Sequence, residues 1–295
     1  MQITKAQHFV WRKYLENWCI NKQLFTKDLS TGKIFNVNPQ NFLKENYIYS
    51  IPILSFNELM EIERHVNQLS NSSSKDINFK FFKLLSDLSI LKALTQIDDE
   101  VDVTSYEKNG LEDFYTQIEY YGKDLISVKS IDDLEEILRF DQNKILNFIL
   151  FQYTRTQNMR DKLRKLISSE PENVRRAKEL LTPIIMSNNV LCTPNQSVKF
   201  KILNNQTNLT FITSDQPASN LKYNSLDGAG NVKEFVVMYP INPHLLLIID
   251  FNFNDDQGLD IVSCDSKTVL YYNKQIELNS NKFLISSNSE QFNIE

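Results

Sequence analysis

Hydrophobic positions in residues 145–167 recur every three or four residues, the spacing of one face of an α-helix. The apolar members of this face are Ile145, Phe148, Ile149, Met159, Leu163, Leu166 and Ile167. Gln152, Arg155 and Thr156 fall within the same face, so in one continuous helix they would point inward with it. A buried guanidinium is costly unless an anionic group meets it. The pattern therefore predicts that this polar gap forms the floor of a functional pocket.

Helical periodicity extends over most of the middle of the chain. It predicts helices over residues 55–66, 79–94, 111–125 and 134–140, the last preceded by an N-cap at Ser130. A further helix is expected from Pro171 to Leu181, with Pro183 ending it. The polar run Leu69–Asp76 is predicted to be an exposed loop that tolerates cleavage or insertion.

Short elements are expected before the helical region. The segment after His8 predicts a short helix with Tyr14, Leu15 and Trp18 on one face. The stretch LFTKDLSTGKIFNV predicts a β-hairpin around its Ser-Thr-Gly turn.

The pattern changes after Pro183, where β-branched and aromatic runs alternate with Asn, Gly and Pro. VKFKI and NLTFITSD are predicted to form a hairpin across NNQTN, with further strands in EFVVMYPI, HLLLIIDFN and KFLISS. A last helix is expected over residues 266–278. We therefore expect one α+β domain over residues 1–295. Its helical region, about 55–181, would pack on an antiparallel or mixed C-terminal sheet within about 195–295.

Charge is unevenly distributed along the chain, whose net charge is −5. Residues 92–141 contain 14 acidic and 5 basic residues, whereas residues 155–178 contain 8 basic and 3 acidic residues. The overall balance argues against binding nucleic acid through bulk charge, but the stretch Arg155–Lys178 offers a local basic surface for it. Alternatively, both stretches are solvated helix faces.

Cysteine content and hydropathy bear on the cellular location. Cys19, Cys192 and Cys264 are far apart and odd in number, so reduced thiols fit better than a disulfide framework. The sequence begins without a hydrophobic signal core, and its longest aliphatic run, residues 245–249, is too short to span a bilayer. We expect a cytoplasmic protein without membrane segments. Gly-rich phosphate loops, GxSxG and HExxH are absent, so the sequence contains no evident cofactor motif.

Two residues are candidates for proton transfer. Asp215 ends a predicted strand and precedes Gln-Pro, which would present an acid to a cleft, or it caps its own turn. His8 has an ordinary pKa near neutrality and can act as a general acid or base, or it is a hydrogen-bonded structural histidine.

Other polar residues are candidates for binding a ligand. Arg155 and Arg160 could clamp a phosphate or carboxylate, or they form internal salt bridges to acids such as Asp215 or Glu119. Asn273 lies among apolar and aromatic residues of the last helix, where it either lines the same pocket or serves as a capping or core amide.

An ordered set of short motifs resembles a known family. QHFVWRKYLENW, FQYTRTQNMR, FITSDQP, YPINPHLLLII and YYNKQI occur in the order found in the bacterial domain-of-unknown-function family 4238. The residues that match its motifs are His8, Tyr14, Gln152, Arg155, Asp215 and Asn273. Glu45 and Glu119 lie where the family tends to have acids. Trp11, Trp18 and Gln157 replace a typical Pro, Phe and Pro, which affects the backbone and packing more than the chemistry.

These residues favour a phosphodiester hydrolase, in which His8 and Asp215 transfer protons. Arg155 and Gln152 would hold the phosphate and stabilise developing charge, with Arg160, Asn273 and Tyr14 completing the ligand site. By analogy, such a protein would be a nuclease-like effector in phage defence or a toxin system. A variant of this hypothesis places a divalent metal on Glu45, Glu119, His8 and Asp215. The alternatives are a binding or sensing module for a small anionic ligand or a protein partner, and a purely structural role.

Overall fold

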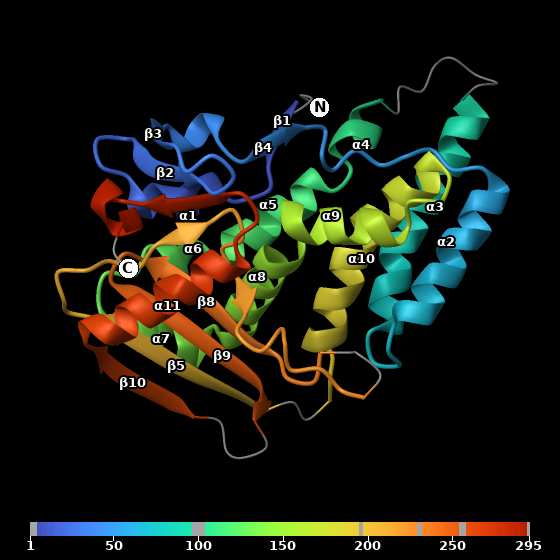
Figure 1. The fold of residues 1–295 in the computed structure, drawn as a ribbon. Coiled ribbons are helices and arrows are strands. Elements are labelled where there is room, and N and C mark those ends of the chain that lie inside the picture. Colours follow the sequence, from blue (N-terminus) through green and yellow to red (C-terminus); the bar gives the residue numbers. More distant parts are fainter. Residues whose placement is uncertain (1–4, 96–103, 195–196, 229–231, 254–257, 294–295) are drawn as a thin grey trace.

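The longest helices lie apart from the sheets in the computed structural model, whereas other helices lie beside the strands (Figure 1). The structure describes residues 5–95, 104–194, 197–228, 232–253 and 258–293. Long helices from the middle of the chain lie on one side, and sheets built mostly from N- and C-terminal residues lie on the other. The α+β class predicted from the sequence is confirmed. One apolar core contains buried residues of both parts, from Phe9 to Ile285.

The C-terminal residues form a five-stranded mixed sheet with the order β10-β5-β9-β8-β7. Its strands are β5 (Ser197–Asn205), β7 (Ser219–Asn220), β8 (Val236–Asn242), β9 (Leu245–Phe253) and β10 (Leu259–Cys264). β10 is parallel to β5, and the other neighbours are antiparallel. Successive side chains of a strand point to opposite faces, so Val237 and Tyr239 join one apolar core while Met238 joins a second. Both faces of this sheet are therefore covered.

A four-stranded antiparallel sheet joins the N-terminal hairpin to late segments, in the order β3-β2-β11-β6. Its strands are β2 (Leu24–Asp28), β3 (Ile34–Val37), β6 (Thr213–Ser214) and β11 (Phe283–Ser286). The predicted β2–β3 hairpin is confirmed, and Gly32 supplies the positive φ of 70° that its turn requires. A third sheet pairs β1 (Ala6–His8) with β4 (Lys44–Asn46).

The predicted hairpin across NNQTN is wrong. β5 pairs with β9 and β10, and the segment after it supplies β6, which pairs with β11 instead. The side chain of Asn205 accepts from the Thr207 backbone N–H at 2.9 Å and donates to the Leu209 carbonyl at 2.6 Å. This local turn leads the chain out of the five-stranded sheet and into the other one.

Eleven α-helices occur within the described residues. They are α1 (Arg12–Leu15), α2 (Phe56–Leu69), α3 (Lys75–Thr95), α4 (Thr104–Asn109), α5 (Glu112–Tyr121), α6 (Lys123–Ile126), α7 (Ile131–Phe140), α8 (Gln142–Thr154), α9 (Gln157–Leu166), α10 (Glu172–Leu191) and α11 (Ser266–Asn279). Short 3₁₀ turns occur at Glu16–Trp18, Pro39–Asn41 and Ser289–Asn293. The predicted cap at Ser130 is confirmed, because Ser130 and Asp133 form a reciprocal capping box.

The helix predicted over residues 145–167 is two helices, α8 and α9, that meet at Arg155 and Thr156. Thr156 has an extended conformation (φ −71°, ψ 161°), and its hydroxyl donates to the side chain of Gln216. The break leaves Leu166 83% exposed, contrary to the expected stripe. The inward orientation of the polar gap is confirmed, because Gln152, Arg155 and Thr156 are all buried.

Pro183 does not end its helix, contrary to expectation. α10 continues to Leu191 with Pro183 inside it. An internal proline costs about 3 kcal/mol because it removes a hydrogen bond and crowds the preceding turn. Residues on both sides of Pro183, such as Leu181 and Ile184, are fully buried, so packing offsets this cost.

Of the predicted loop Leu69–Asp76, only residues 70–74 form a turn, since Leu69 ends α2 and Lys75 and Asp76 begin α3. Ser72 and Ser73 are exposed, as predicted, but Ser74 is fully buried. Asn189 of α10 accepts from the Asn71 backbone N–H at 3.2 Å and from the Ser74 hydroxyl. The prediction of a loosely held loop is therefore wrong for this half of the turn.

Candidate functional site

A polar cavity of about 260 Å³ lies between β1, α1 and α5. Its lining residues are Ala6, His8, Trp11, Arg12, Lys13, Tyr49, Glu112, Tyr115, Thr116 and Glu119. The cavity contains one of the predicted catalytic residues, His8, and its wall includes Glu119, which contacts a second, Arg155. We take this cavity, called the His8 pocket below, as the candidate functional site.

Helix α5 supplies the two acids of the His8 pocket. Glu112, Tyr115 and Glu119 are spaced by three and four residues, so they lie along one face of the helix. Leu111 and Ile118 are buried in the core and hold this face in place. The local sequence therefore positions two carboxyl groups on the same wall.

The Glu112 carboxyl group is half-buried and unusually basic. Its Oε2 atom is buried without a hydrogen-bond partner among the described residues. Burial, assisted by the negative charge of Glu119, raises the pKa of Glu112 from 4.5 to about 7. Glu112 can therefore exchange a proton with a substrate near neutral pH.

The His8 imidazole is half-buried in the same pocket. Its Nε2–H donates to the Pro39 carbonyl at 3.2 Å, which leaves Nδ1 as an acceptor. Burial lowers the pKa of His8, and the nearby cations Lys44, Arg12 and Arg155 lower it further, outweighing the hydrogen bond to Pro39. His8 is therefore neutral at pH 7 and can accept a proton.

Arg155 lies behind the pocket wall with its side chain only 1% exposed. Its Nη2 donates to Glu119 at 2.7 Å and to Gln152 at 3.3 Å, and the guanidinium carbon lies 5.5 Å from the centre of the Tyr115 ring. Burial raises the pKa of Glu119, although the guanidinium of Arg155 opposes that rise. Of the predicted alternatives for Arg155, an internal salt bridge to Glu119 is the one present.

Arg160 also forms an ion pair within the protein. Its Nη1 lies 3.2 Å from the Glu45 carboxylate, and its guanidinium packs over the ring of Phe9 and donates to Gln157. The predicted acids Glu45 and Glu119 therefore each meet one of the two predicted arginines.

Asp215 makes contacts that favour a structural role. Its carboxylate accepts from the backbone N–H groups of Asn281 at 3.0 Å, Lys282 at 2.8 Å and Phe283 at 3.3 Å. Burial raises the pKa of Asp215, and these three donors oppose that rise. Asp215 does not line the His8 pocket. These donors belong to the segment that leads into β11 and not to the turn of Asp215 itself, so Asp215 ties together two distant parts of the chain, and we exclude it from the candidate site.

Tyr14 and Asn273 also bind protein groups. The Tyr14 hydroxyl lies 2.6 Å from that of Thr213, in the buried core. The Asn273 side chain donates to the Thr210 carbonyl at 2.8 Å and accepts from the Ile212 N–H at 3.1 Å. Both residues fix the chain segment that leads into β6, and neither lines the His8 pocket.

Comparison with known proteins identifies the family. A family model described as a protein of unknown function (DUF4238) matches residues 6–290. The chain belongs to the DUF4238 family. No curated protein and no solved structure shows a significant match to it.

This DUF4238 chain does not assemble the proposed metal set. Across the described ranges, no three His, Cys, Asp or Glu side chains are grouped so that they could hold a metal ion. Glu45 and Glu119 are each paired with an arginine, and Asp215 binds backbone N–H groups.

None of the helices that the structure describes is both long and apolar enough to cross a membrane.

The basic stretch Arg155–Lys178 is largely neutralised by internal ion pairs. Arg164 binds Glu179 at 2.8 Å, and Lys178 lies 2.7 Å from Glu170 and 3.2 Å from Glu61. Arg155 and Arg160 are paired as described above. Most of the positive charge that could attract a nucleic acid there is therefore already compensated.

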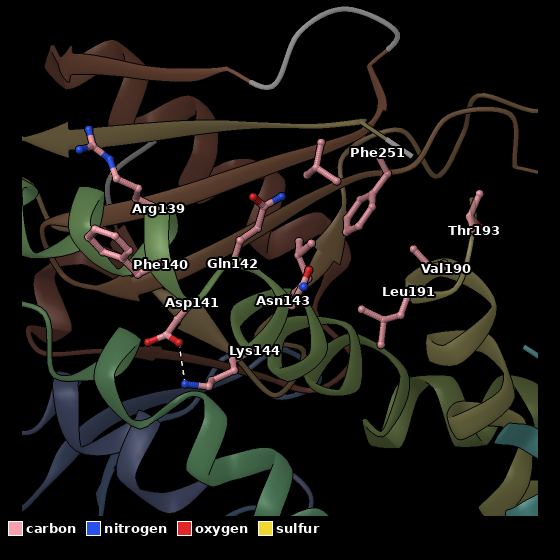
Figure 2. Close-up of a pocket in the computed structure, with 12 residues that line it drawn as sticks. Arg139, Phe140, Asp141, Gln142, Asn143, Lys144, Val190, Leu191, Thr193 and Phe251 are labelled. Atoms are coloured by element: carbon pink, nitrogen blue, oxygen red, sulfur yellow. Dashed lines mark hydrogen bonds and ion pairs between the residues drawn. The ribbon is translucent and has the colours of Figure 1, made fainter. Parts of the chain in front are cut away.

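A second cavity, of about 490 Å³, lies at the junction of α7 and α8 (Figure 2). Arg139, Phe140 and the N-terminal residues of α8 line it together with Val190, Leu191 and Phe251. Asp141 and Lys144 form an ion pair of 2.6 Å on the side opposite Phe251. Although this cavity is larger, it contains no histidine and no pair of carboxyl groups, so we prefer the His8 pocket.

Glu112, Arg12 and Lys13 were not identified from the sequence. Glu112 occurs in an acidic stretch, where a charged residue ordinarily faces solvent. The spacing of the sequence does indicate its position. Glu112 lies three residues before Tyr115 and seven before Glu119, which places all three on one helical face.

Proposed function

We propose that the His8 pocket is the active site of a hydrolase that cleaves phosphodiester bonds. One observation carries the proposal: a carboxyl group with a pKa of about 7 and an unpartnered oxygen, Glu112, lines the same cavity as a neutral histidine, His8. Active sites commonly hold two titratable groups whose surroundings push their pKa values in opposite directions.

The two groups suit general acid–base catalysis. His8 Nδ1 would accept the proton of an attacking water or hydroxyl, and protonated Glu112 would donate a proton to the leaving oxygen. Arg155 does not reach the cavity lining, so it acts through Glu119, whose orientation it fixes. In this arrangement Glu112 takes the place of Asp215 as the second proton-transfer residue.

The substrate class is inferred from charge. Lys13 is exposed at the rim of the pocket, beside Arg12, which also lies 3.2 Å from Glu16, and these cations would attract an anionic group. Phosphodiesters are anions that need both proton transfer and charge stabilisation. A nuclease-like effector in phage defence or a toxin system follows by analogy only. A cytoplasmic location fits the three free cysteines.

A binding module is the second candidate. The buried donors Arg155 Nε, Arg155 Nη1 and Gln152 Nε2 have no acceptor among the residues that the structure describes. Donors of this kind favour an anionic ligand, which would be recognised without turnover.

Cleavage assays with active-site variants test the proposal. RNA, single- and double-stranded DNA and cyclic and linear dinucleotides would be incubated with the protein, with and without divalent metal. Glu112→Gln and His8→Ala should each lower kcat by about 10²–10⁴-fold and leave substrate binding nearly unchanged. Glu136→Gln, on the exposed face of α7, is the matched control. Absence of cleavage by the wild type, or wild-type rates in both pocket variants, rejects the hydrolase in favour of the binding module.

A further inference from the structure

Three arginines surround a small void behind the His8 pocket. Arg155, Arg160 and Arg176 line this void, which has a volume of about 10 Å³. Tyr49 and Tyr115 line both the void and the His8 pocket, and their stacked rings, 4.2 Å apart, form the wall between the two. We call this space the arginine void.

Several donors at the arginine void lack an acceptor. Arg155 Nε, Arg155 Nη1 and Arg160 Nε are buried without a hydrogen-bond partner in the described part of the chain. The side chains of Arg155 and Arg160 are only 1% and 6% exposed, so bulk solvent does not satisfy these groups. A buried donor left unpaired is costly, so an acceptor is expected nearby.

The charge of the void favours an anion. Three guanidinium groups line it, together with one carboxylate, Glu179. That carboxylate accepts two hydrogen bonds from Arg164, at 2.8 and 2.9 Å, and lies 3.7 Å from Nη1 of Arg176. Burial lowers the pKa of Arg176; the Glu179 carboxylate opposes this fall, and the nearby cations Arg160 and Arg164 add to it.

The size of the void restricts the occupant. The space open to the centre of a water-sized sphere is about 10 Å³, so the void holds one small occupant, a water molecule or a monatomic ion. Phosphate, sulfate and carboxylates are too large. A water molecule would bring two hydrogens that need acceptors among groups that mostly donate, whereas a monatomic anion only accepts.

We propose that the arginine void binds a single halide-sized anion, chloride under ordinary conditions. The anion accepts the unpaired N–H groups of Arg155 and Arg160 and reduces the repulsion between the three guanidinium groups. It thereby supports the tyrosine wall of the His8 pocket from behind, whatever reaction that pocket performs.

Chloride titration tests the site without any activity assay. The protein would be exchanged into gluconate, and chloride added at constant ionic strength while the melting temperature is followed. We expect the melting temperature of the wild type to rise with the logarithm of chloride concentration. In crystals soaked in bromide, one anomalous peak should lie within hydrogen-bond distance of the Arg155 and Arg160 guanidinium groups.

Charge-conserving variants separate the site from general salt effects. Arg155→Lys and Arg160→Lys should each abolish the chloride dependence, whereas Arg64→Lys, at an exposed arginine of α2, should retain it. If one lysine variant fails to fold, the other variant and the bromide peak still test whether the void binds an anion. A melting temperature independent of chloride, an equal dependence in the folded lysine variants, or no bromide peak at the void overturns the proposal.

Discussion

Arg155 shows what a single residue reveals before its surroundings are known. Its position within an apolar stripe predicted burial and the need for a partner, and both are confirmed. Its partner could not be settled, because Glu119 and Asp215 were equally good acids by sequence. The choice depends on which helix packs against α8, and side-chain type does not encode that. Glu112 was missed for the same reason: its raised pKa comes from burial by tertiary packing.

The raised pKa of Glu112 predicts a specific dependence of stability on pH. The unfolded chain ionises this carboxyl above its ordinary pKa of 4.5, whereas the folded chain holds the proton until about pH 7. Within that window the folded state binds more protons, so the free energy of unfolding falls as pH rises. Glu112→Gln removes this fall. Relative to wild type, it should gain about 1–2 kcal/mol between pH 4 and 8, a value reduced for solvent screening of a partly exposed group.

Urea unfolding of both proteins at pH 4, 6 and 8 measures this difference, with Glu136→Gln as the control. Parallel stability curves for wild type and Glu112→Gln would contradict a raised pKa at this position.

Removing the Arg155 cation should be strongly destabilising. Arg155→Met leaves Glu119 as a mostly buried carboxylate without its partner, at a cost of about 3–5 kcal/mol in urea unfolding. The double variant with Glu119→Met should recover part of this loss, because both charges are then absent. Lys83→Met, in the exposed pair with Asp87, should cost at most about 1 kcal/mol. A similar small cost for Arg155→Met would show that the buried pair is not needed.

Helices and strands were predictable where their periodicity is uninterrupted, and less so where tertiary contacts overrule local signals. The β2–β3 hairpin, the cap at Ser130 and the helix from Ser266 follow from local rules and are confirmed. Two helix boundaries were predicted wrongly. The helix with Pro183 continues to Leu191, beyond its predicted end, whereas the helix predicted through Arg155 is divided into two. Packing carries α10 through the proline, and the inward hydrogen bond of Thr156 to Gln216 accompanies the break between α8 and α9.

Asn189 should hold the α2–α3 turn in place. Its side chain donates to the Leu69 carbonyl at 2.7 Å and accepts from Asn71 and Ser74. Asn189→Ala should lower the free energy of unfolding by about 1–3 kcal/mol, because these groups lose their partner. Hydrogen exchange of amides in α2 and the start of α3 should accelerate. Asn67→Ala, at an exposed position of α2, should change stability by less than about 0.5 kcal/mol; an equal effect of both variants would contradict the anchoring role.

At the scale of the whole molecule, the class was predictable and the pairing of strands was not. Composition and the change of pattern after Pro183 indicate helices followed by strands. The partition into two larger sheets depends on long-range pairing, such as β2 with β11, which no local signal announces. Asp215 illustrates the consequence, because its three donors at residues 281–283 lie far along the chain.

Asp215 should contribute to stability and not to turnover. Asp215→Ala removes the acceptor of three backbone N–H groups at the start of β11, so it should cost about 2–4 kcal/mol in thermal or urea unfolding. At temperatures where the variant remains folded, its kcat per folded molecule should equal that of wild type. A folded Asp215→Ala protein with kcat reduced 10²-fold would return this residue to the catalytic machinery.

The pairing of β2 with β11 also constrains how the molecule folds. Phe25 is paired with Ser286, and Trp18 donates to the Phe211 carbonyl at 3.0 Å, so early residues are held by late ones. Closing loops of this length precedes any gain from the contacts they create, which slows folding. During synthesis β2 would leave the ribosome long before its partner strand β11. The four-stranded sheet can then be completed only after residues 283–286 have emerged, so β2 keeps an unpaired edge until nearly the whole chain has been made.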